Sequence, residues 1–296
     1  MKQLTCILSL AAVVLLSSCG RESFESKVLS VEPVDSLGYT LVTSEVYPGR
    51  GDTIKVWIAL PDEWDGRFVG TGGSGFYGGK VVNAVKWARK GMVGAACNGG
   101  HDCAAWSFLY DPATGKLNDV LAEDFGHYAI HVMTVYAKEY IREHYGRDPE
   151  YSYFTGASSG GRHALHVAEK YYRDYDGIFS GCPAWHNDLY VPGRTWAQVV
   201  MKDEDHLIPF EVFDEVRQAL VAHEDGRDGV VDGIVNNPFD LDFDIYSLVG
   251  TTVAGREFTQ KDADVITRIW DGCDYEDGKL WYYFTRTTDF HKVALS

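Results

Sequence analysis

Residues 151–165 read Y-S-Y-F-T-G-A-S-S-G-G-R-H-A-L, and this stretch decides the fold. A short run of aromatic and β-branched residues at 151–155 leads into the pattern G-x-S-x-G, and a helix-compatible segment follows at 162–171. Strand, G-x-S-x-G and helix in this order are typical of a nucleophile elbow, the sharp turn that lifts a serine hydroxyl above the end of a sheet. The bare pattern can also arise by chance, but the flanking strand and helix favour the elbow.

The elbow predicts the groups that would carry the chemistry. Ser158 is the candidate nucleophile, and the backbone N–H of Ser159, at the start of the following helix, is a candidate donor to an oxyanion. A second donor is expected from the glycine cluster T-G-G-S-G-F-Y-G-G at 71–79, which follows a predicted strand and precedes a predicted helix. We expect Gly73 to supply this N–H. The rival interpretations of the cluster are a phosphate-binding loop, whose Gly-Lys-Ser/Thr ending is missing, and a plain flexible turn.

The remaining segments predict an α/β protein of the α/β-hydrolase type with a mostly parallel sheet. The order strand–helix–strand–helix–strand across residues 67–182 carries this prediction. After Pro183 aromatic and charged residues interleave in longer helical patterns, so we expect a hydrolase core at 28–182 and an inserted lid domain at 183–296. Strands are expected at 28–31, 39–46, 53–60, 67–70, 92–96 and, buried, 176–182, and helices at 82–90, 124–145, 185–202, 209–223 and 259–270, the last with Thr259 and Asp262 as a capping box.

The N-terminus and the charge indicate an exported protein. An apolar stretch at 4–16 follows Lys2 and ends in L-S-S-C-G, which resembles the lipobox of bacterial lipoproteins. We expect a signal peptide at 1–18, lipidation of Cys19 and a polar tether at 19–27, which would place the protein in the periplasm or at the cell surface. An ordinary secretory signal is the alternative. The formal net charge of −16 argues against nucleic acid and anionic membranes as partners, so membrane contact is expected only through the lipid anchor.

Four cysteines remain once Cys6 is assigned to the signal and Cys19 to lipid. Disulfides are permitted in an oxidising compartment, and Cys97 and Cys103 are close enough in sequence to pair. Connectivity stays open at this point, because spacing alone does not decide it. The other candidates are Cys182 and Cys273.

An acidic loop at 225–234, D-G-R-D-G-V-V-D-G-I, is the candidate metal site. Asp225, Asp228 and Asp232 bring like charges together, and glycines allow the chain to wrap so that carbonyls can join the carboxylates around Ca²⁺. The spacing differs from that of an EF-hand. A solvated turn is the alternative, because Asp-Gly is common in turns, but the mutual repulsion of the carboxylates favours a cation.

Taken together, these motifs resemble the tannase and feruloyl esterase family of α/β-hydrolases. The resemblance implies a serine esterase acting on aromatic acid esters, such as hydroxycinnamate or gallate esters, whose alcohol side can belong to a plant polysaccharide. It assigns the nucleophile to Ser158. It also implies a structural Ca²⁺ held by the side chains of Asp225, Asp228 and Asp232 and by the carbonyls of Val230 and Ile234. The matching segments are 72–76, 91–102, 124–131, 145–147, 153–162, 175–177 and 225–234.

The sequence departs from the family pattern at several positions. The family commonly has a cysteine before the nucleophile, where this chain has Ala157, and a cysteine pair that brackets the calcium loop, where it has Glu224 and Leu241. The family order is Ser, Asp, His, with the last two in a final core segment beyond the lid, and no credible triad Asp or His is found here. His163 and His166 follow the elbow on its own helix and cannot easily reach back to it.

Three hypotheses of different classes result. The first is an esterase that works through an acyl-enzyme at Ser158. The second, motivated by the missing base, is a catalytically incomplete fragment or a non-catalytic binding lipoprotein of the same fold. The third is a peptidase or lipase of the same fold, which the calcium loop disfavours.

Overall fold

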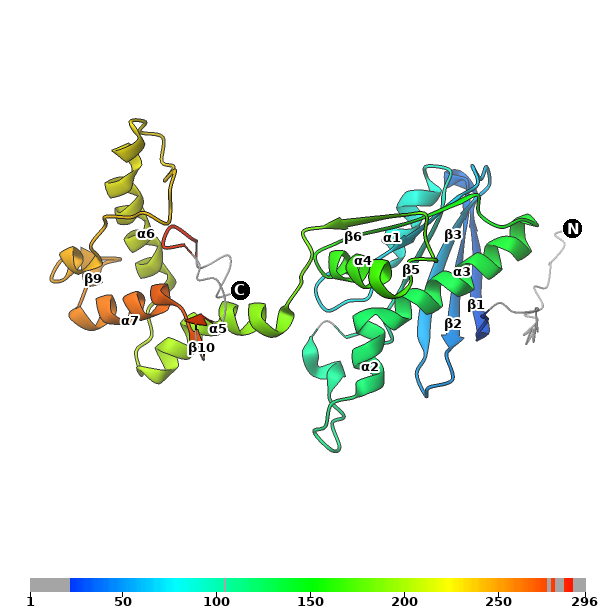
Figure 1. Cartoon of the computed structure of the whole chain (residues 1–296), viewed down its shortest axis with the longest axis horizontal. Helices are drawn as coiled ribbons and strands as arrows, with labels where there is room; N and C mark the ends of the chain where they lie inside the picture. The colour runs from blue at the N-terminus through cyan, green and yellow to red at the C-terminus, as the bar shows by residue number, and fades with distance from the viewer. Residues whose placement is uncertain (1–21, 104, 276–277, 280–284, 290–296) are drawn as a thin grey trace, which may run out of the picture. The chain divides into compact units, whose positions relative to one another are not determined.

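The computed structural model describes residues 22–103, 105–275, 278–279 and 285–289. The expected signal peptide and Cys19 lie outside these residues. The chain divides into two compact units, Met1–Trp185 and His186–Ser296 (Figure 1). No helix among the described residues is long and apolar enough to cross a membrane.

The first unit contains a seven-stranded mixed sheet with the order β1-β2-β3-β5-β4-β6-β7. The pairs β1–β2, β2–β3 and β3–β5 are antiparallel. The pairs β5–β4, β4–β6 and β6–β7 are parallel. Parallel neighbours need crossover connections, and helices α1, α3 and α4 supply them. The bounds are β1 Glu25–Val34, β2 Tyr39–Tyr47, β3 Ile54–Pro61, β4 Arg67–Thr71, β5 Val93–Cys97, β6 Tyr151–Ala157 and β7 Gly177–Gly181, and α1 Val81–Ala88, α3 Ala129–Tyr145 and α4 Ser159–Lys170.

The helices cover both faces of this sheet because its central strands are apolar on both sides. On β5, Ala95 and Cys97 belong to the core that contains α3 and α4 residues, while Ala96 between them packs with Ala84 and Val85 of α1. Successive strand residues point to opposite faces. Helix α1 therefore lies on one face of the sheet, and α3 and α4 lie on the other (Figure 1).

The helix expected at 124–145 differs from the prediction in its first turns. Helix α2 (Asp119–Glu123) leads into a π-helical turn, η3 (Asp124–Tyr128), and regular α3 begins only at Ala129. Gly146, at a φ of 71°, ends the helix as expected. A π turn inside a helix carries no hydropathy pattern of its own, so periodicity does not reveal it.

Two further expectations for the first unit are corrected. The expected tether extends too far, because Glu25, Ser26 and Lys27 already pair with β2. Strand β7 was expected to be buried, yet it is the last strand of the sheet and Phe179 on it is 65% exposed. An edge strand lacks a neighbour on one side, which its apolar composition does not reveal.

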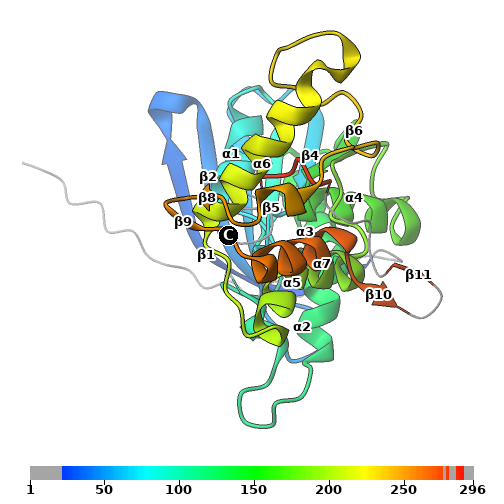
Figure 2. The ribbon, with the colours of Figure 1, turned by 90° about the vertical axis from the view of Figure 1, so that its left-hand side faces the viewer.

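The second unit is mainly helical and has its own core. Its buried apolar side chains come from all of its long helices and from the segment 243–258. Figure 2 shows the ribbon of these helices, α5, α6 and α7. Thr259 and Asp262 form the predicted capping box, with the Thr259 N–H donating to the Asp262 carboxylate at 2.8 Å. The bounds are α5 Asn187–Asp203, α6 Phe210–Glu224, α7 Gln260–Asp271, β8 Thr252–Val253, β9 Arg256–Glu257, β10 Asp274–Tyr275, β11 Gly278–Lys279, and the short 3-10 helices η4 Asp225–Asp228 and η5 Ile245–Leu248.

Candidate active site

Ser158 lies at the predicted elbow between β6 and α4. Its backbone has φ 58° and ψ −121°, a conformation that a non-glycine residue adopts at a strain of about 1–3 kcal/mol. The turn is fixed by its backbone: the Ser158 N–H donates to the Gly181 carbonyl at 3.0 Å, and its carbonyl accepts from Arg162 and Ala184, each at 3.0 Å. The residue is exposed, so the strained turn presents its side chain to solvent.

The glycines around Ser158 are required by close backbone contacts. A Cβ on Gly156 would lie 2.2 Å from the Gly160 carbonyl oxygen, and one on Gly72 would lie 2.6 Å from the Cα of Gly160. A Cβ on Gly161 would lie 2.4 Å from the Gly181 carbonyl oxygen. The first turn of α4 therefore packs directly on the backbone of β6, of β7 and of the glycine loop at 72–79, which brings that loop beside the elbow.

Two hydrogen bonds join the glycine loop to α4. The Ser159 hydroxyl donates to the Gly75 carbonyl at 2.6 Å, and the Gly73 N–H donates to Nδ1 of His163 at 3.4 Å. Ser159 is the first residue of α4, where backbone N–H groups have no partner within the helix. The structure thus brings Ser158, Ser159 and Gly73 together, but the Gly73 N–H already has an acceptor. Its role as an oxyanion donor stays a prediction.

His163 is not placed as a base for Ser158. Its ring is 1% exposed, and its Nε2 donates to the Phe125 carbonyl at 2.8 Å. Burial and the charge of Arg162 lower the pKa of His163 to about 3, so the imidazole is neutral. Burial also lowers the pKa of His166, whose ring lies 5.2 Å from Trp185. Among the described residues of the first unit, no histidine hydrogen bonds to the Ser158 hydroxyl.

A buried pair of carboxyl groups, which the sequence analysis did not identify, lies at the start of the π turn. Asp52 and Asp124 have side chains that are 1% and 0% exposed, and Arg50 forms an ion pair with each. Burial, and then the neighbouring Asp52, raise the pKa of Asp124 to about 8. Both oxygens of Asp52 and Oδ2 of Asp124 have no hydrogen-bond partner among the described residues. The raised pKa means that Asp124 keeps its proton near neutral pH.

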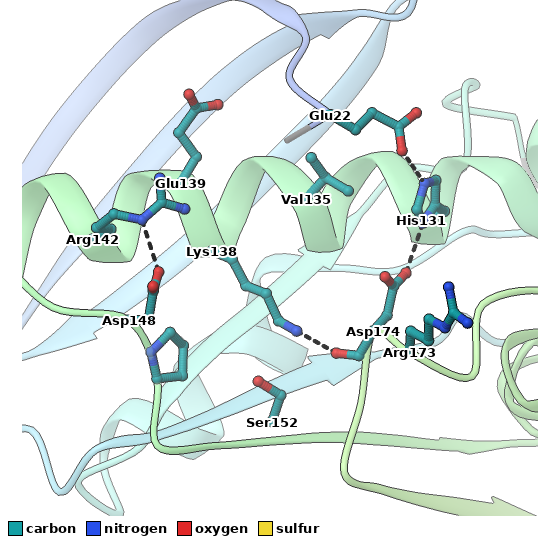
Figure 3. A pocket seen from close by; sticks show the side chains of 11 residues that line it. Glu22, His131, Val135, Lys138, Glu139, Arg142, Asp148, Ser152, Arg173 and Asp174 are labelled. Atoms are coloured by element: carbon teal, nitrogen blue, oxygen red, sulfur yellow. Dashed lines mark hydrogen bonds and ion pairs between the residues drawn. The ribbon is translucent and has the colours of Figure 1, made fainter. Parts of the chain in front are cut away.

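A cavity of about 440 Å³ along α3 contains a second cluster of charged groups (Figure 3). The His131 ring lies between Asp174 at 2.6 Å and Glu22 at 2.9 Å. Burial disfavours the charged imidazole, but the hydrogen bonds and charges of the two carboxylates outweigh it and raise the pKa of His131. Ser152 of the lining belongs to the start of β6, at the end of the strand opposite to Ser158, so this cavity is not the elbow site.

In the second unit, the acidic loop is organised by its own backbone. One carboxylate oxygen of Asp225 accepts from the N–H groups of Asp232 at 3.0 Å and Gly233 at 2.8 Å. Asp228 and Asp232 each accept from the N–H two residues further on, at Val230 and Ile234. The structure thus brings Asp225 close to Asp232. The described residues contain no group of three or more His, Cys, Asp or Glu side chains placed to hold a metal, and the expected Ca²⁺ site stays a prediction.

Hydrogen bonds close this loop at the positions where the family pattern has a cysteine pair. The buried Glu224 accepts from the Asp242 N–H at 2.8 Å and pairs with Arg227 at 2.5 Å. Arg227 in turn donates to the Asp240 carbonyl at 2.8 Å. Glu224 and its partner segment next to Leu241 are therefore connected by polar contacts.

The disulfide considered between Cys97 and Cys103 is not present. Cys97 is a buried free thiol whose Sγ lies 3.6 Å from the Ala129 carbonyl oxygen, and burial raises its pKa to about 12. Cys103 Sγ lies 3.2 Å from the Ser107 hydroxyl.

Comparison with known proteins identifies the family. The family model described as tannase and feruloyl esterase matches residues 40–289. The chain belongs to this family. A probable feruloyl esterase from Arthroderma benhamiae is 35% identical over 229 residues, which make up 74% of this chain and 42% of that protein. Feruloyl esterase B from Aspergillus niger is 28% identical over 238 residues, 78% of this chain and 44% of that protein. This family member thus spans less than half the length of these curated relatives.

Solved structures confirm the predicted α/β-hydrolase fold. Feruloyl esterase B from Aspergillus oryzae aligns with a TM-score of 0.71 at 20% identity, covering 90% of this chain and 57% of that one. Tannin acyl hydrolase from Aspergillus niger aligns with a TM-score of 0.66 at 23% identity, covering 90% and 54%. At these identities the likeness concerns the fold alone.

Proposed function

We propose that this tannase and feruloyl esterase family member is a serine carboxylic-ester hydrolase acting on aromatic acid esters of the feruloyl or galloyl type. The observation that carries the proposal is the strained, exposed Ser158 beside a glycine loop. The names of the relatives support the substrate class. An aromatic acid linked to a plant polysaccharide is one substrate of this class.

The proposed reaction is a two-step acyl transfer. The Ser158 oxygen attacks the ester carbonyl, and the N–H of Ser159, with an N–H of the glycine loop, binds the oxyanion of the tetrahedral intermediate. Collapse of this intermediate expels the alcohol and leaves an acyl-enzyme, which water hydrolyses to release the aromatic acid. Ser158 gives up its hydroxyl proton as it attacks, and the leaving alcohol takes one up, so the reaction needs a group that accepts and returns a proton. No histidine of the described first unit hydrogen bonds to Ser158.

Labelling by a fluorophosphonate tests this proposal directly. The intact mass of residues 19–296, produced without lipid, is measured after exposure to the probe, with Ser158→Ala as the matched control. A single adduct that disappears in the control is expected, together with Ser158-dependent hydrolysis of methyl ferulate. Hydrolysis that persists unchanged in Ser158→Ala overturns the assignment of the nucleophile.

The absent histidine contact favours a second candidate, a binding lipoprotein of the same fold that performs no chemistry. This alternative predicts a folded product that binds an aromatic ester without consuming it and takes up no fluorophosphonate. Titration with methyl ferulate followed by product analysis distinguishes it from the esterase.

We also propose that the acidic loop binds a structural Ca²⁺ through Asp225, Asp228 and Asp232 and the carbonyls of Val230 and Ile234. The support is the concentration of carboxylates and the folding of Asp225 back onto Asp232. A rise in the melting temperature on addition of Ca²⁺, lost in Asp228→Ala, is expected; an unchanged temperature overturns the proposal.

For the N-terminus we propose export and lipidation at Cys19. The support is the lipobox-like sequence at 16–20. Metabolic labelling with a fatty acid, compared between the native sequence and Cys19→Ala, tests this anchor, and incorporation that does not depend on Cys19 overturns it.

A further inference from the structure

His163 lies on the elbow helix and contacts the glycine loop. It is located in the second turn of α4, and its ring is almost completely buried. Its two nitrogens contact two backbone groups that are far apart in sequence, the Gly73 N–H at 3.4 Å and the Phe125 carbonyl at 2.8 Å. The ring therefore connects three elements: the glycine loop, the π turn and α4.

These contacts fix the tautomer of His163. A carbonyl oxygen can only accept, so Nε2 must carry the proton that is donated to Phe125. A backbone N–H can only donate, so Nδ1 must be the bare nitrogen that accepts from Gly73. Burial and the neighbouring Arg162 keep the ring neutral, because they lower its pKa to about 3. Only the neutral Nε2–H form satisfies both backbone contacts. Arg162 Nη2 also lies 3.3 Å from Nε2, and in this form it donates to the Phe125 carbonyl instead.

The Phe125 carbonyl is a fixed anchor for this ring. It belongs to the π turn and also accepts from Arg162 Nη2 at 3.3 Å. The Arg162 guanidinium lies over the Phe125 ring, with its central carbon 4.6 Å from the ring centroid. Because the Phe125 carbonyl accepts from both Arg162 and His163, the orientation of the His163 ring, and with it the position of Nδ1, depends on the π turn as well as on α4.

We propose that His163 is a positioning residue that orients the Gly73 peptide and thereby sets the glycine loop against Ser158. The Ser159 hydroxyl donates to the Gly75 carbonyl at 2.6 Å and is the second hydrogen bond that fixes the same loop to α4. Donors for an oxyanion work because they are oriented before the reaction, and a displacement of about 1 Å can slow a reaction roughly 100-fold. The catalytic consequence rests on the proposed esterase function, whereas the positioning itself does not.

Two matched variants separate the two contacts of His163. In His163→Asn the side-chain oxygen can occupy the place of Nδ1 and accept from Gly73, but nothing reaches Phe125. In His163→Gln the side-chain amide can reach the place of Nε2 and donate to Phe125, but Nδ1 has no counterpart. Amide hydrogen exchange of residues 72–75 is expected to stay close to the wild-type rate in His163→Asn. It should become roughly five- to tenfold faster in His163→Gln, the effect of losing one hydrogen bond. Equal rates in the two variants overturn the proposal.

A measurement on the unaltered protein keeps the test decisive if a variant does not fold. Nitrogen-15 NMR of labelled histidine at neutral pH is expected to show the His163 ring neutral, with a protonated Nε2 and a bare Nδ1. A protonated Nδ1 rules out acceptance from Gly73 and overturns the proposal.

The catalytic consequence is measured by the rate of fluorophosphonate labelling at Ser158. His163→Gln is expected to label on the order of tenfold more slowly than His163→Asn. If the unaltered protein does not label at all, the proposed esterase function fails, while the exchange and NMR measurements still decide the role of His163.

Discussion

Replacing Asp124 by Asn should change the pH dependence of stability. The pKa of this carboxyl group is raised to about 8 in the folded protein, mainly by burial and then by Asp52, while an unfolded Asp titrates near 3.9. The folded state therefore keeps a proton that the unfolded state releases. The stability from this proton is complete below about pH 4 and is lost as the pH rises towards about 8. Asn carries no titrating proton and should be insensitive to pH over this window.

The magnitude follows from the difference between the two pKa values. About four units at about 1.4 kcal/mol per unit give an upper limit of roughly 6 kcal/mol. Because Arg50 compensates part of the charge of an ionised Asp124, we expect about 2–3 kcal/mol. For a unit of this size that is roughly 4–12 °C in melting temperature. Asp124→Asn should therefore gain this much relative to the wild type between pH 5 and pH 9.

Thermal melts followed by circular dichroism from pH 5 to pH 9 measure this difference. Asp148→Asn, at a carboxyl group that is 47% exposed and pairs with Arg142, is the matched control and should show no such trend. Asp52→Asn should reduce the trend without abolishing it, because burial, the main cause of the raised pKa of Asp124, remains when the repulsion from Asp52 is removed. A constant difference between Asp124→Asn and the wild type at every pH refutes the raised pKa of Asp124. It would mean that Asp124 is ionised and paired with Arg50 throughout.

Three other changes have expected outcomes. His131→Gln should speed hydrogen exchange at residues 22–24 and lower the free energy of unfolding by about 1 kcal/mol at low pH. Because the pKa of His131 is raised, this loss of stability should shrink as the pH rises through that pKa. A difference in exchange rate between variant and wild type that is the same at every pH would contradict this prediction. Gly156→Ala should lower the free energy of unfolding in urea by about 3 kcal/mol, because the new Cβ would overlap backbone atoms. Gly126→Ala is the control, since no atom lies within 4 Å of its Cβ position, and it should cause no such loss. Equal losses in the two variants would contradict the packing argument. Glu224→Ala should lower the melting temperature by an amount equivalent to about 2 kcal/mol, because a buried charged hydrogen bond is lost, and no change would mean the loop closes without it.

Those parts of the site that depend on backbone geometry could be predicted from the sequence. Strand β6, the turn at Ser158 and helix α4 lie where the G-x-S-x-G pattern places them, because glycine and serine report local steric requirements. The capping box of α7 was predicted for the same reason, since a cap depends on residues three positions apart. Ca²⁺ binding and lipidation at Cys19 remain predictions.

Those parts that depend on distant partners could not be predicted. Asp52 and Asp124 are 72 positions apart in the printed sequence, and each reads as an ordinary polar residue beside a turn. His163 reads as a helical histidine, and its partners come from the glycine loop and from a π turn that has no hydropathy pattern. Strand β7 was assigned to the interior because apolar composition does not distinguish an edge strand from a central one.

The π turn explains why both missed features occur at the same place. Its first residue, Asp124, carries the buried carboxyl group that pairs with Arg50, and its second, Phe125, offers the carbonyl that His163 binds. Adjacent residues in a regular α-helix point about 100° apart and have their carbonyls used within the helix. In the π turn the Phe125 carbonyl accepts from the Arg162 and His163 side chains, so a single dipeptide contacts a charge cluster through the Asp124 side chain and the elbow helix through the Phe125 backbone. The ion pair of Asp124 with Arg50 and the hydrogen bond of Phe125 with His163 are therefore made by adjacent residues of one turn.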